Sequence, residues 1–496
     1  TSVIIASNTV SPFLKSIMGL FPQLLFLFIG SVFICGFLKV FQLYQNKKKL
    51  LKTFKSFPGP ASHWFYGHSK QTVRAQELVK VLEWTEKYPY AFPRWFNGFM
   101  ATLHISHPDY AKAVFNHGGK QFILFVSAGE GLLVLHGPKW FQHRRLLTPG
   151  FHYDILKPYV ALIAESTKVM LDKWEKLLEK DTTKSLEMFE HVSLMTLDSI
   201  MKCAFGSQDL DNYIKAVYDL TYLISKRVRN IFYWNNLMFR CTSAGQRFLE
   251  ACRLAHQHTE KVIEERKKVF KQEAELEKIQ KKRYLDFLDI LLCARDEHGM
   301  GLSDDDLRAE VDTFMFEGHD TTASGIAWIL YAMAQNPEHQ QRCREEIMEV
   351  LGDRDTIQHD LGKIPYTTMC VKESLRLYPP VPTVSRQLSK PITFCDGQFL
   401  KHKTQYCNLT AREVFDPTRF SPEKSPQRHS HAFVPFAAGP RNCIGQQFAM
   451  NEMKVALAQI LLRFEIMPDP AKLPIPVPQI VLKSENGIHL LLKKRN

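Results

Sequence analysis

The chain has 496 residues, 45% of them hydrophobic, and a formal net charge of +13 at pH 7. This length is enough for one large core or two domains. The first acidic residue is Glu77, and nine of the 64 basic residues precede it. The rest of the chain, which holds all 51 acidic residues, is therefore nearly balanced in charge. Nucleic-acid binding needs a basic face on the folded domain, and we therefore expect no nucleic-acid partner.

The ten cysteines show neither a CxxC pair nor zinc-finger spacing. Their pattern argues against structural zinc sites and against a disulfide framework. Free thiols on a large domain indicate a reducing compartment, such as the cytosolic side of a membrane.

The first long apolar segment, residues 16–38, carries no charge and is long enough to cross a bilayer as a helix. Lys15 precedes it, whereas six lysines follow it up to Lys55. The positive-inside rule then places the N-terminus outside or in the lumen and the large domain in the cytosol. The alternatives are a cleavable signal peptide, which should be shorter and end in small residues, and a buried core helix, which fits poorly with the basic flank.

Residues 57–60 read Phe-Pro-Gly-Pro, which predicts a stiff, extended hinge. The sequence therefore divides into a tail and transmembrane anchor over 1–45, a basic linker and hinge over 46–60, and a large domain over 61–496.

Residues 77–135 contain no GxGxxG after a strand and no GxxxxGK[ST]. These glycine-rich loops are typical of nucleotide-binding folds, so none is predicted. A redox reaction on this chain would need electrons from another protein.

Trp140 and Arg144 begin a helical pattern and lie four residues apart, hence on one helix face. By themselves they fit an exposed arginine beside a core tryptophan. An arginine that binds an anionic ligand is the alternative.

Residues 155–260 are predicted to form several helices, and the charged stretch 260–283 a solvated helix or linker. A basic and aromatic cluster within the first range either meets a membrane interface or packs internally. It consists of Arg227, Arg229, Phe232, Tyr233, Trp234 and Phe239.

Ser303 and the three aspartates after it predict a helix start, and the helix continues to about residue 334. Polar residues interrupt its apolar middle, where they are costly. Glu317, Asp320 and Thr321 are three or four residues apart, so we expect them on one side. A water-filled polar patch is the structural alternative to a chemical site.

Glu373 and Arg376 are spaced to form an ion pair within one helix, which on a surface would contribute little. Arg419 lies in a later Phe-Asp-Pro-Thr-Arg-Phe segment. Arg386 follows two prolines in a run typical of a strand.

Residues 436–445 form a glycine-rich loop directly before a helical pattern. Cys443 therefore lies where backbone N–H groups and the helix dipole favour a thiolate. Gly439 and Gly445 allow close approach of a flat ligand, and Arg441 can reach an anionic group on it. A buried, inert cysteine is the alternative for a lone residue. A thiolate on a tight loop beside an arginine suits axial ligation of haem iron.

The loop pattern Phe-x-x-Gly-x-Arg-x-Cys-x-Gly resembles the cysteine loop of the cytochrome P450 superfamily. From about Phe57 to its end the chain is similar to family four, closest to subfamily B, which contains terminal-carbon hydroxylases of fatty acids and xenobiotics. The resemblance implies a mainly α-helical haem-thiolate fold with a minor β part, on one N-terminal transmembrane helix, with residues 61–496 as the catalytic domain.

The resemblance also implies roles for the motifs described above. Cys443 would ligate the iron of haem b, and Glu373, Arg376 and Arg419 would form a buried structural triad. Residues implied to contact the haem or its propionates are Trp140, Arg144, Arg386, Phe436 and Arg441.

On the opposite haem face, the family pattern implies that Asp320 and Thr321 are catalytic and relay protons during oxygen activation. Glu317 replaces a small residue of that pattern. In the family-four branch a glutamate at this position can form an ester with a haem methyl group.

The implied protein is a microsomal monooxygenase of the endoplasmic reticulum membrane that uses O₂ and electrons from NADPH-cytochrome reductase, with cytochrome b5 as an optional second donor. Its expected substrates are fatty acids, at or near the terminal carbon, and small lipophilic xenobiotics. The alternatives are a peroxide-using haem-thiolate isomerase, which needs no proton relay, and a non-catalytic, membrane-tethered haem-binding or scaffold protein.

The scaffold alternative arises because residues 397–414 are shorter than the family pattern. We expect that strand pairing near the substrate channel is lost there. Residues 118–130 are also short, so we assign no substrate contacts to them. The sequon at Asn408 would face the cytosol, away from glycosylation.

Overall fold

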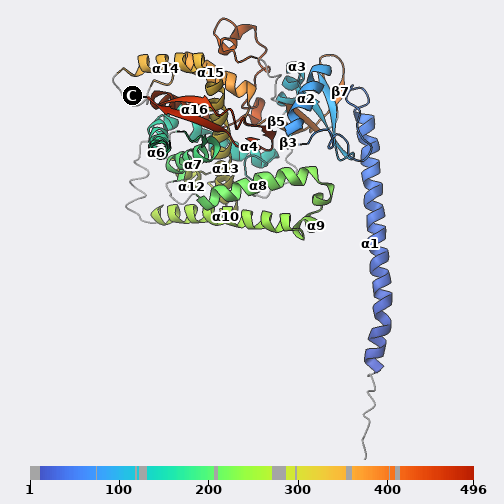
Figure 1. Ribbon diagram of the computed structural model, residues 1–496. Helices are drawn as coiled ribbons and strands as arrows, with labels where there is room; N and C mark the ends of the chain where they lie inside the picture. The colour runs from blue at the N-terminus through green and yellow to red at the C-terminus, as the bar shows by residue number, and fades with distance from the viewer. Residues whose placement is uncertain are drawn as a thin grey trace, which may run out of the picture.

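The computed structural model describes residues 12–73, 75–117, 120–121, 131–181, 183–205, 211–270, 286–295, 299–352, 360–400, 403–407 and 414–495. Helices form most of this part of the chain, with a smaller β part beside them, as expected (Figure 1). The helices before the central one are α1 (Pro12–Thr53), α2 (Ala75–Lys87), α3 (Pro108–Asn116), α4 (Gly137–Leu147), α5 (Tyr153–Leu156), α6 (Tyr159–Lys180), α7 (Met188–Ile200), α8 (Asp211–Arg229), α9 (Asn236–Arg240), α10 (Ser243–Phe270) and α12 (Phe287–Cys293).

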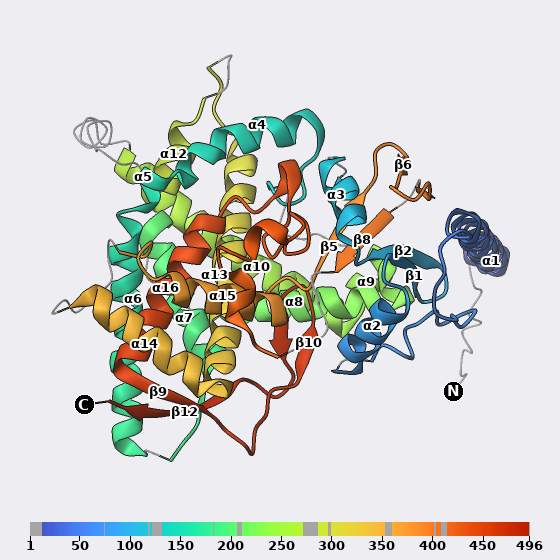
Figure 2. The same cartoon turned by 90° about the horizontal axis from the view of Figure 1, so that it is seen from above.

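The remaining helices are the central α13 (Asp304–Gln335), α14 (Pro337–Leu351), α15 (Pro365–Leu377) and α16 (Gln446–Arg463). Figure 2 shows α13 in the middle of the helical part, and it packs against α7, α10, α15 and α16. Ser303 caps its start, because the Ser303 hydroxyl accepts a hydrogen bond from the Asp306 N–H at 3.1 Å. The capping predicted from the sequence is confirmed.

The strands are β1 (Ala91–Phe96), β2 (Met100–Ile105), β3 (Lys120–Gln121), β4 (Leu186–Glu187), β5 (Thr383–Gln387), β6 (Ile392–Thr393), β7 (Phe399–Leu400), β8 (Lys403–Cys407), β9 (Phe464–Pro468), β10 (Pro476–Pro478), β11 (Leu482–Ser484) and β12 (His489–Lys494). The largest sheet has the order β1-β2-β8-β5-β3, in which only the β2–β8 pair is parallel. Smaller sheets are β4-β12-β9 and the pairs β10-β11 and β6-β7.

The expected loss of strand pairing in residues 397–414 is wrong. Strand β8 lies between β2 and β5, and Thr404 is directly opposite Arg386. The short segment still supplies five residues that complete the backbone hydrogen bonds of both neighbours, so β5 and its arginine remain fixed in a sheet. The sequon at Asn408 and most of residues 118–130 lie outside the described residues.

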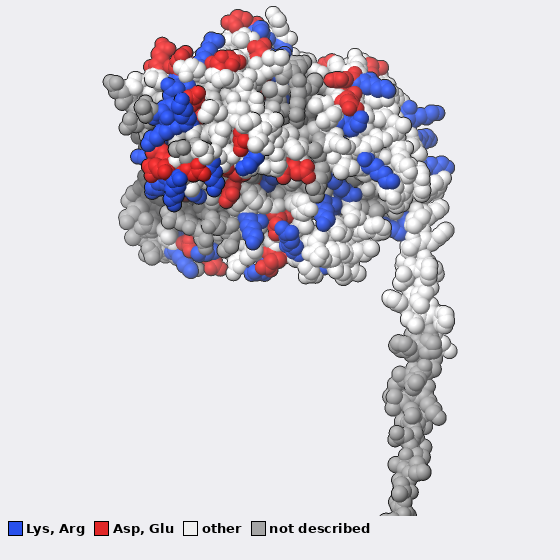
Figure 3. Space-filling view, in the orientation of Figure 1, with Lys and Arg blue, Asp and Glu red and all other residues white. Residues whose placement is uncertain are grey.

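Helix α1 leads away from the rest of the molecule (Figure 1) and includes residues that the sequence assigned to a linker. By length and composition, Leu25–Thr53 could cross a membrane, and none of its apolar window is buried. Basic side chains gather where the helix meets the folded part (Figure 3). This arrangement is consistent with membrane anchoring.

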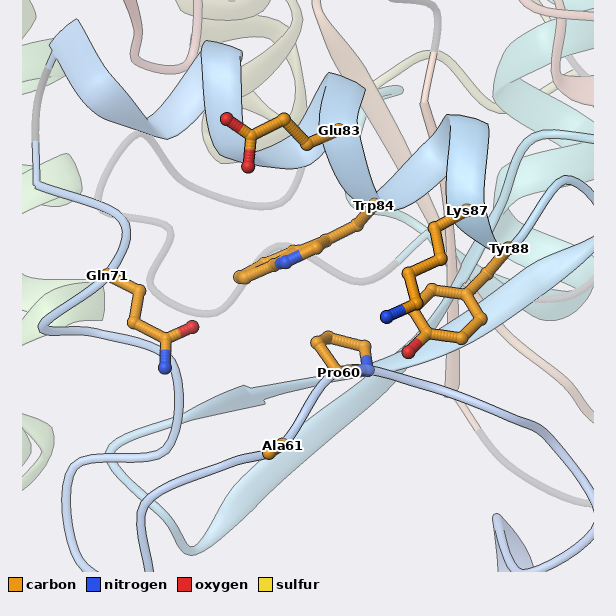
Figure 4. Close-up of a pocket in the computed structure, with 7 residues that line it drawn as sticks. All are labelled: Pro60, Ala61, Gln71, Glu83, Trp84, Lys87 and Tyr88. Atoms are coloured by element: carbon orange, nitrogen blue, oxygen red, sulfur yellow. The ribbon is translucent and has the colours of Figure 1, made fainter.

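The end of α1 and the hinge are packed rather than free. Leu50, Phe54 and Phe57 are buried in a second hydrophobic cluster together with β1, β2 and α3. The following Pro60 and Ala61 face Trp84 of α2 across a small cavity of about 340 Å³ (Figure 4). The proline segment therefore runs along α2 as part of the folded domain.

The motif on α15 is a buried ion-pair cluster. Glu373 is completely buried and accepts hydrogen bonds from Arg376 Nε at 2.8 Å and Nη2 at 2.7 Å. Arg419 Nε lies 3.5 Å from the same carboxylate, and the Asp416 N–H donates to it at 3.0 Å. The three residues predicted to form a triad are thus brought together, and they link α15 to the segment before the cysteine loop.

A second buried carboxyl group, Glu452 on α16, is not paired with a cation. It is fully buried, and burial raises its pKa to about 8, while a hydrogen bond from the Ser199 side chain acts in the opposite direction. The carboxyl group is therefore protonated at neutral pH.

Glu452 makes the stability of the protein depend on pH. Because its pKa is higher in the folded protein than in the unfolded chain, its contribution is fully present below about pH 4.5 and is lost as the pH rises through about 8. We expect Glu452→Gln to remove this contribution. Between pH 6 and pH 8 the free energy of unfolding of the wild type should therefore fall by about 2 kcal/mol relative to that of the variant. Urea unfolding at pH 6 and pH 8 measures the two free energies. Glu338→Gln, which changes an exposed carboxylate, is the control. The same pH dependence of the free energy of unfolding in wild type and Glu452→Gln would contradict the expectation.

Candidate functional site

A cavity of about 540 Å³ lies at the centre of the molecule, between α13, α4, α8, β5 and the loop before α16. Most of its lining is apolar, with a small number of charged residues. The residues predicted for the site that line it are Trp140, Arg144, Glu317, Thr321, Arg386, Phe436, Arg441 and Cys443. Sequence positions more than 300 residues apart therefore meet at one cavity.

The cysteine loop is held in a tight turn at one wall of the cavity. The Cys443 N–H donates to the Phe436 carbonyl at 2.9 Å. Gly439 has φ +72°, and a Cβ there would lie 2.4 Å from the Phe115 carbonyl oxygen, so only glycine fits. The loop thus places Cys443 just before the start of α16.

The Cys443 thiol is exposed to this cavity and lies deep within the protein. Burial raises its pKa to about 12, with a smaller contribution from Glu317, while a hydrogen bond from the Gly445 backbone acts in the opposite direction. The expectation that this setting favours a thiolate over a thiol is therefore wrong for the thiol by itself, because desolvation outweighs the Gly445 hydrogen bond. A bound metal ion would replace the proton, since it deprotonates a coordinating thiol.

Three arginines gather beside Cys443. Arg144 donates to the carbonyl and side-chain oxygen of Asn442 at 3.0 and 2.9 Å. Arg441 donates to the Leu135 carbonyl at 2.6 Å and stacks 4.3 Å above the ring of Trp140. These contacts fix the two guanidinium groups at the cavity wall.

The third arginine, Arg386, is 2% exposed and donates to the Arg441 carbonyl at 3.4 Å. Burial, together with a smaller contribution from a neighbouring arginine, lowers the pKa of Arg386 and of Arg441 to about 10. Buried like charges repel one another and favour an anionic ligand between them. The wall beside Cys443 is therefore suited to a ligand that carries carboxylates.

Helix α13 also lines the cavity, with Glu317, Gly318, Thr321 and Thr322. The Thr321 hydroxyl donates to the Glu317 carbonyl at 2.8 Å. Burial raises the pKa of Glu317 to about 8, and Glu310 adds to this shift. Glu317 Oε1 is buried without a hydrogen-bond partner among the described residues, which is unusual for a carboxyl group at a cavity.

Asp320 does not share the side of Glu317 and Thr321, so that expectation is wrong. It is fully buried, does not line the cavity, and lies 3.2 Å from Lys483 Nζ of β11. Lys483 also lies 4.2 Å from the ring centre of Tyr218. Around the helix, Asp320 lies about 60° from Glu317 on the side away from Thr321 and about 100° from Thr321, and here this points it toward Lys483 of β11 instead.

Sequence reasoning missed a buried pair that joins α4 to α13. His143 Nδ1 lies 2.6 Å from Glu310 Oε1, and the Leu132 N–H donates to the other oxygen at 3.0 Å. Both side chains are buried. Since His143 adjoins Arg144, this pair fixes the helix that carries Trp140 and Arg144. The one signal for it in the sequence is the position of Glu310 on the buried face of the α13 helical pattern.

The profile of the cytochrome P450 family matches residues 57–491. The chain belongs to the cytochrome P450 family. It is 54% identical over 481 residues to cytochrome P450 4B1 of Rattus norvegicus, covering 92% of this chain and 93% of that protein. It is also 54% identical over 484 residues to cytochrome P450 4A11 of Homo sapiens, covering 92% of each.

These relatives place the chain in cytochrome P450 family 4 and identify it as a monooxygenase of that family. The expected family is confirmed, but identity to 4A and 4B relatives is equal, so the subfamily is not distinguished. Haem is the cofactor of cytochrome P450 proteins, and a reductase is their redox partner. A thiol at one wall with a buried cationic cluster beside it fits this cofactor.

Proposed function

We propose that this cytochrome P450 hydroxylates fatty acids at or near the terminal carbon, and small lipophilic xenobiotics, with O₂ and electrons from NADPH-cytochrome reductase and, optionally, cytochrome b5. The observation that carries the proposal is the mostly apolar cavity that Cys443, Glu317 and Thr321 line together. The similarity to 4A and 4B relatives supports the choice of substrate class.

In this proposal the Cys443 sulfur holds the iron, and Arg144, Arg386 and Arg441 neutralise the haem propionates. Phe436 and Trp140 pack beside them. Haem b, when bound, supplies the oxygen chemistry, and thiolate ligation favours cleavage of the O–O bond.

The distal residues hold and move protons. The Thr321 hydroxyl lies at the cavity wall and orients water for proton delivery. Asp320, next to it in the helix, carries protons from the side of Lys483, which lies 3.2 Å away. The two residues then connect Lys483 with the cavity.

Glu317 has a further proposed role as an ester link to a haem methyl group. Its formation would replace a methyl C–H bond with a C–O bond, a two-electron oxidation for which the O₂ and reductase of the proposed reaction would supply the oxidant. Its carboxyl group is buried, lines the cavity and has one oxygen without a partner among the described residues. A covalent link would stiffen the pocket, which helps to position a terminal methyl group whose C–H bonds are intrinsically less reactive.

We expect acid-acetone extraction to leave wild-type haem on the protein and to release it from Glu317→Ala. The reason is that only the ester resists extraction, whereas the Cys443–iron bond does not survive acid. Mass spectrometry of the extracted protein measures the retained mass. Glu338→Gln, an exposed carboxylate on α14, is the control, and intact haem released from wild type would rule out the ester.

The proposed location is the endoplasmic reticulum membrane, with residues 1–45 as lumenal tail and anchor, 46–60 as linker and hinge, and 61–496 as a cytosolic catalytic domain. The apolar helix Leu25–Thr53 and the lysines that follow the uncharged segment support this topology.

The function is tested by reconstituting the purified protein with NADPH-cytochrome reductase and phospholipid and supplying dodecanoate. We expect NADPH- and O₂-dependent formation of the terminal and penultimate alcohols, measured by chromatography with mass spectrometry. Haem-loaded protein that is reduced by the reductase, yet forms neither alcohol from acids of several chain lengths, would refute the proposed substrate class.

A further inference from the structure

A group of charged residues lines the same cavity on elements that do not carry the cysteine loop. Glu77 lies in the first turn of α2, Arg94 in β1 and Arg229 at the end of α8, and all three line the cavity. In Figure 2, α2 and β1 lie between the helical part and α1. The cluster therefore belongs to the part of the cavity formed by α2, β1 and the end of α8.

Glu77 holds both arginines in place. Arg94 Nη2 pairs with one Glu77 oxygen, and Arg229 Nη2 donates to the other at 2.6 Å. Arg229 also donates to the Pro478 carbonyl of β10 at 3.1 Å. The side chains of Arg94 and Glu77 are 5% and 9% exposed, whereas that of Arg229 is 36% exposed.

The cluster carries an excess positive charge. Two guanidinium groups share one carboxylate, so its formal charge is +1 in a cavity that is otherwise mostly apolar. One incoming carboxylate would neutralise it, and a guanidinium binds a carboxylate through strong, charge-assisted hydrogen bonds. Thr102, which is directly opposite Arg94 in the β1–β2 pair, lines the cavity beside it with a hydroxyl group.

The arginines beside Cys443 are assigned to the haem propionates, and Glu317 adds no positive charge to its part of the cavity. The group formed by Glu77, Arg94 and Arg229 is thus a second cationic group on the lining of a mostly apolar cavity.

We propose that Arg94 and Arg229, held by Glu77, bind the carboxylate of a fatty-acid substrate. This inference rests on the proposed function for the substrate class, and it adds the residues that recognise the acid group. With its carboxylate held there, an extended acyl chain directs its methyl end toward Cys443. The cluster therefore determines which end of the substrate reacts.

The test compares dodecanoate with 1-dodecanol, which has the same chain length and no charge. Both are titrated into haem-loaded wild-type and variant proteins, and the substrate-induced change in the haem absorption spectrum gives each Kd. We expect Arg229→Met and Arg94→Met to weaken dodecanoate binding by about tenfold to a hundredfold, because a charge-assisted hydrogen bond is lost. Binding of 1-dodecanol should be unchanged.

Glu77→Gln separates ligand recognition from a structural role. It leaves both arginines without their anionic partner and raises the formal charge of the cluster to +2, so dodecanoate should bind more tightly than to wild type. A cluster that only joins α2, β1 and α8 would instead lose binding of acid and alcohol alike. Arg247→Met, which removes a surface arginine paired with Asp219 of α8, is the control and should change neither Kd.

Equal changes in the two Kd values in all three cluster variants would overturn the inference. Failure of the proposed function gives a different result. If the acid binds through the arginines and no alcohol forms, the hydroxylase proposal fails and the binding site stands; if alcohol forms and binding does not depend on charge, only the binding site fails.

Discussion

Replacing Cys443 with alanine should abolish both the thiolate-ligated haem spectrum and NADPH-dependent hydroxylation, a loss of at least about 10³-fold, as for removal of a central catalytic group in other enzymes. Four sulfur-containing residues line the cavity, namely Met100, Cys252, Cys443 and Met453, and of these Cys443 lies in the loop that also carries Arg441. Without it, the loop can offer no thiolate to the iron. Carbon monoxide difference spectra and product formation measure the two losses.

Cys241→Ala is the matched control, because Cys241 is exposed at the end of α9. It should leave the spectrum and the rate unchanged. Retention of the thiolate spectrum in Cys443→Ala would show that another residue ligates the iron, and the assignment of the cysteine loop would then be wrong.

Arg376→Met should lower the free energy of unfolding by about 3–5 kcal/mol, the usual cost of removing one partner from a buried ion pair. Glu373 is completely buried, and Arg376 donates two hydrogen bonds to it. Arg419 remains nearby, but its side chain is 38% exposed and lies 3.5 Å away, so it cannot replace both bonds. Denaturant unfolding of the haem-loaded protein measures the change.

Arg253→Met on α10 is a close control, since Arg253 pairs with Glu250 at the same spacing of three residues. Both of those side chains are more than half exposed, and water replaces their interaction, so no measurable loss of stability is expected. Equal unfolding curves for wild type and Arg376→Met would mean that the buried pair does not stabilise this region.

The sequence was most informative where a local rule and a short motif agreed. The N-cap at Ser303 and the loop around Gly439 follow from backbone requirements that are visible in the residues themselves. The family resemblance then brought together Arg144, Arg386 and Arg441, which line one cavity although they lie far apart in the chain.

Other features depend on tertiary contacts that local patterns do not contain. The direction of Asp320 is set by Lys483, about 160 residues later in the chain. The pKa of Cys443 is set by burial, which the loop sequence does not reveal. The cluster of Glu77, Arg94 and Arg229 joins three elements, and the sequence marks Arg229 only as part of a basic and aromatic group that could contact a membrane.

The basic and aromatic cluster within residues 227–239 is partly packed inside the protein and partly exposed, so both alternatives suggested by the sequence apply to it. Phe239 is buried and Arg227 donates to the Tyr233 carbonyl at 2.9 Å, whereas Phe232 is 64% exposed. Contact of the exposed part with a membrane interface stays a prediction.

The packing of Leu50, Phe54 and Phe57 against β1, β2 and α3 has a practical consequence for producing the protein without detergent. A version lacking the apolar helix keeps this hydrophobic cluster intact only when the cut falls before Leu50. A cut placed after the hinge would expose the apolar side chains of β1, β2 and α3 that Leu50, Phe54 and Phe57 cover. Aggregation of the shortened protein would then be mistaken for a need for lipid.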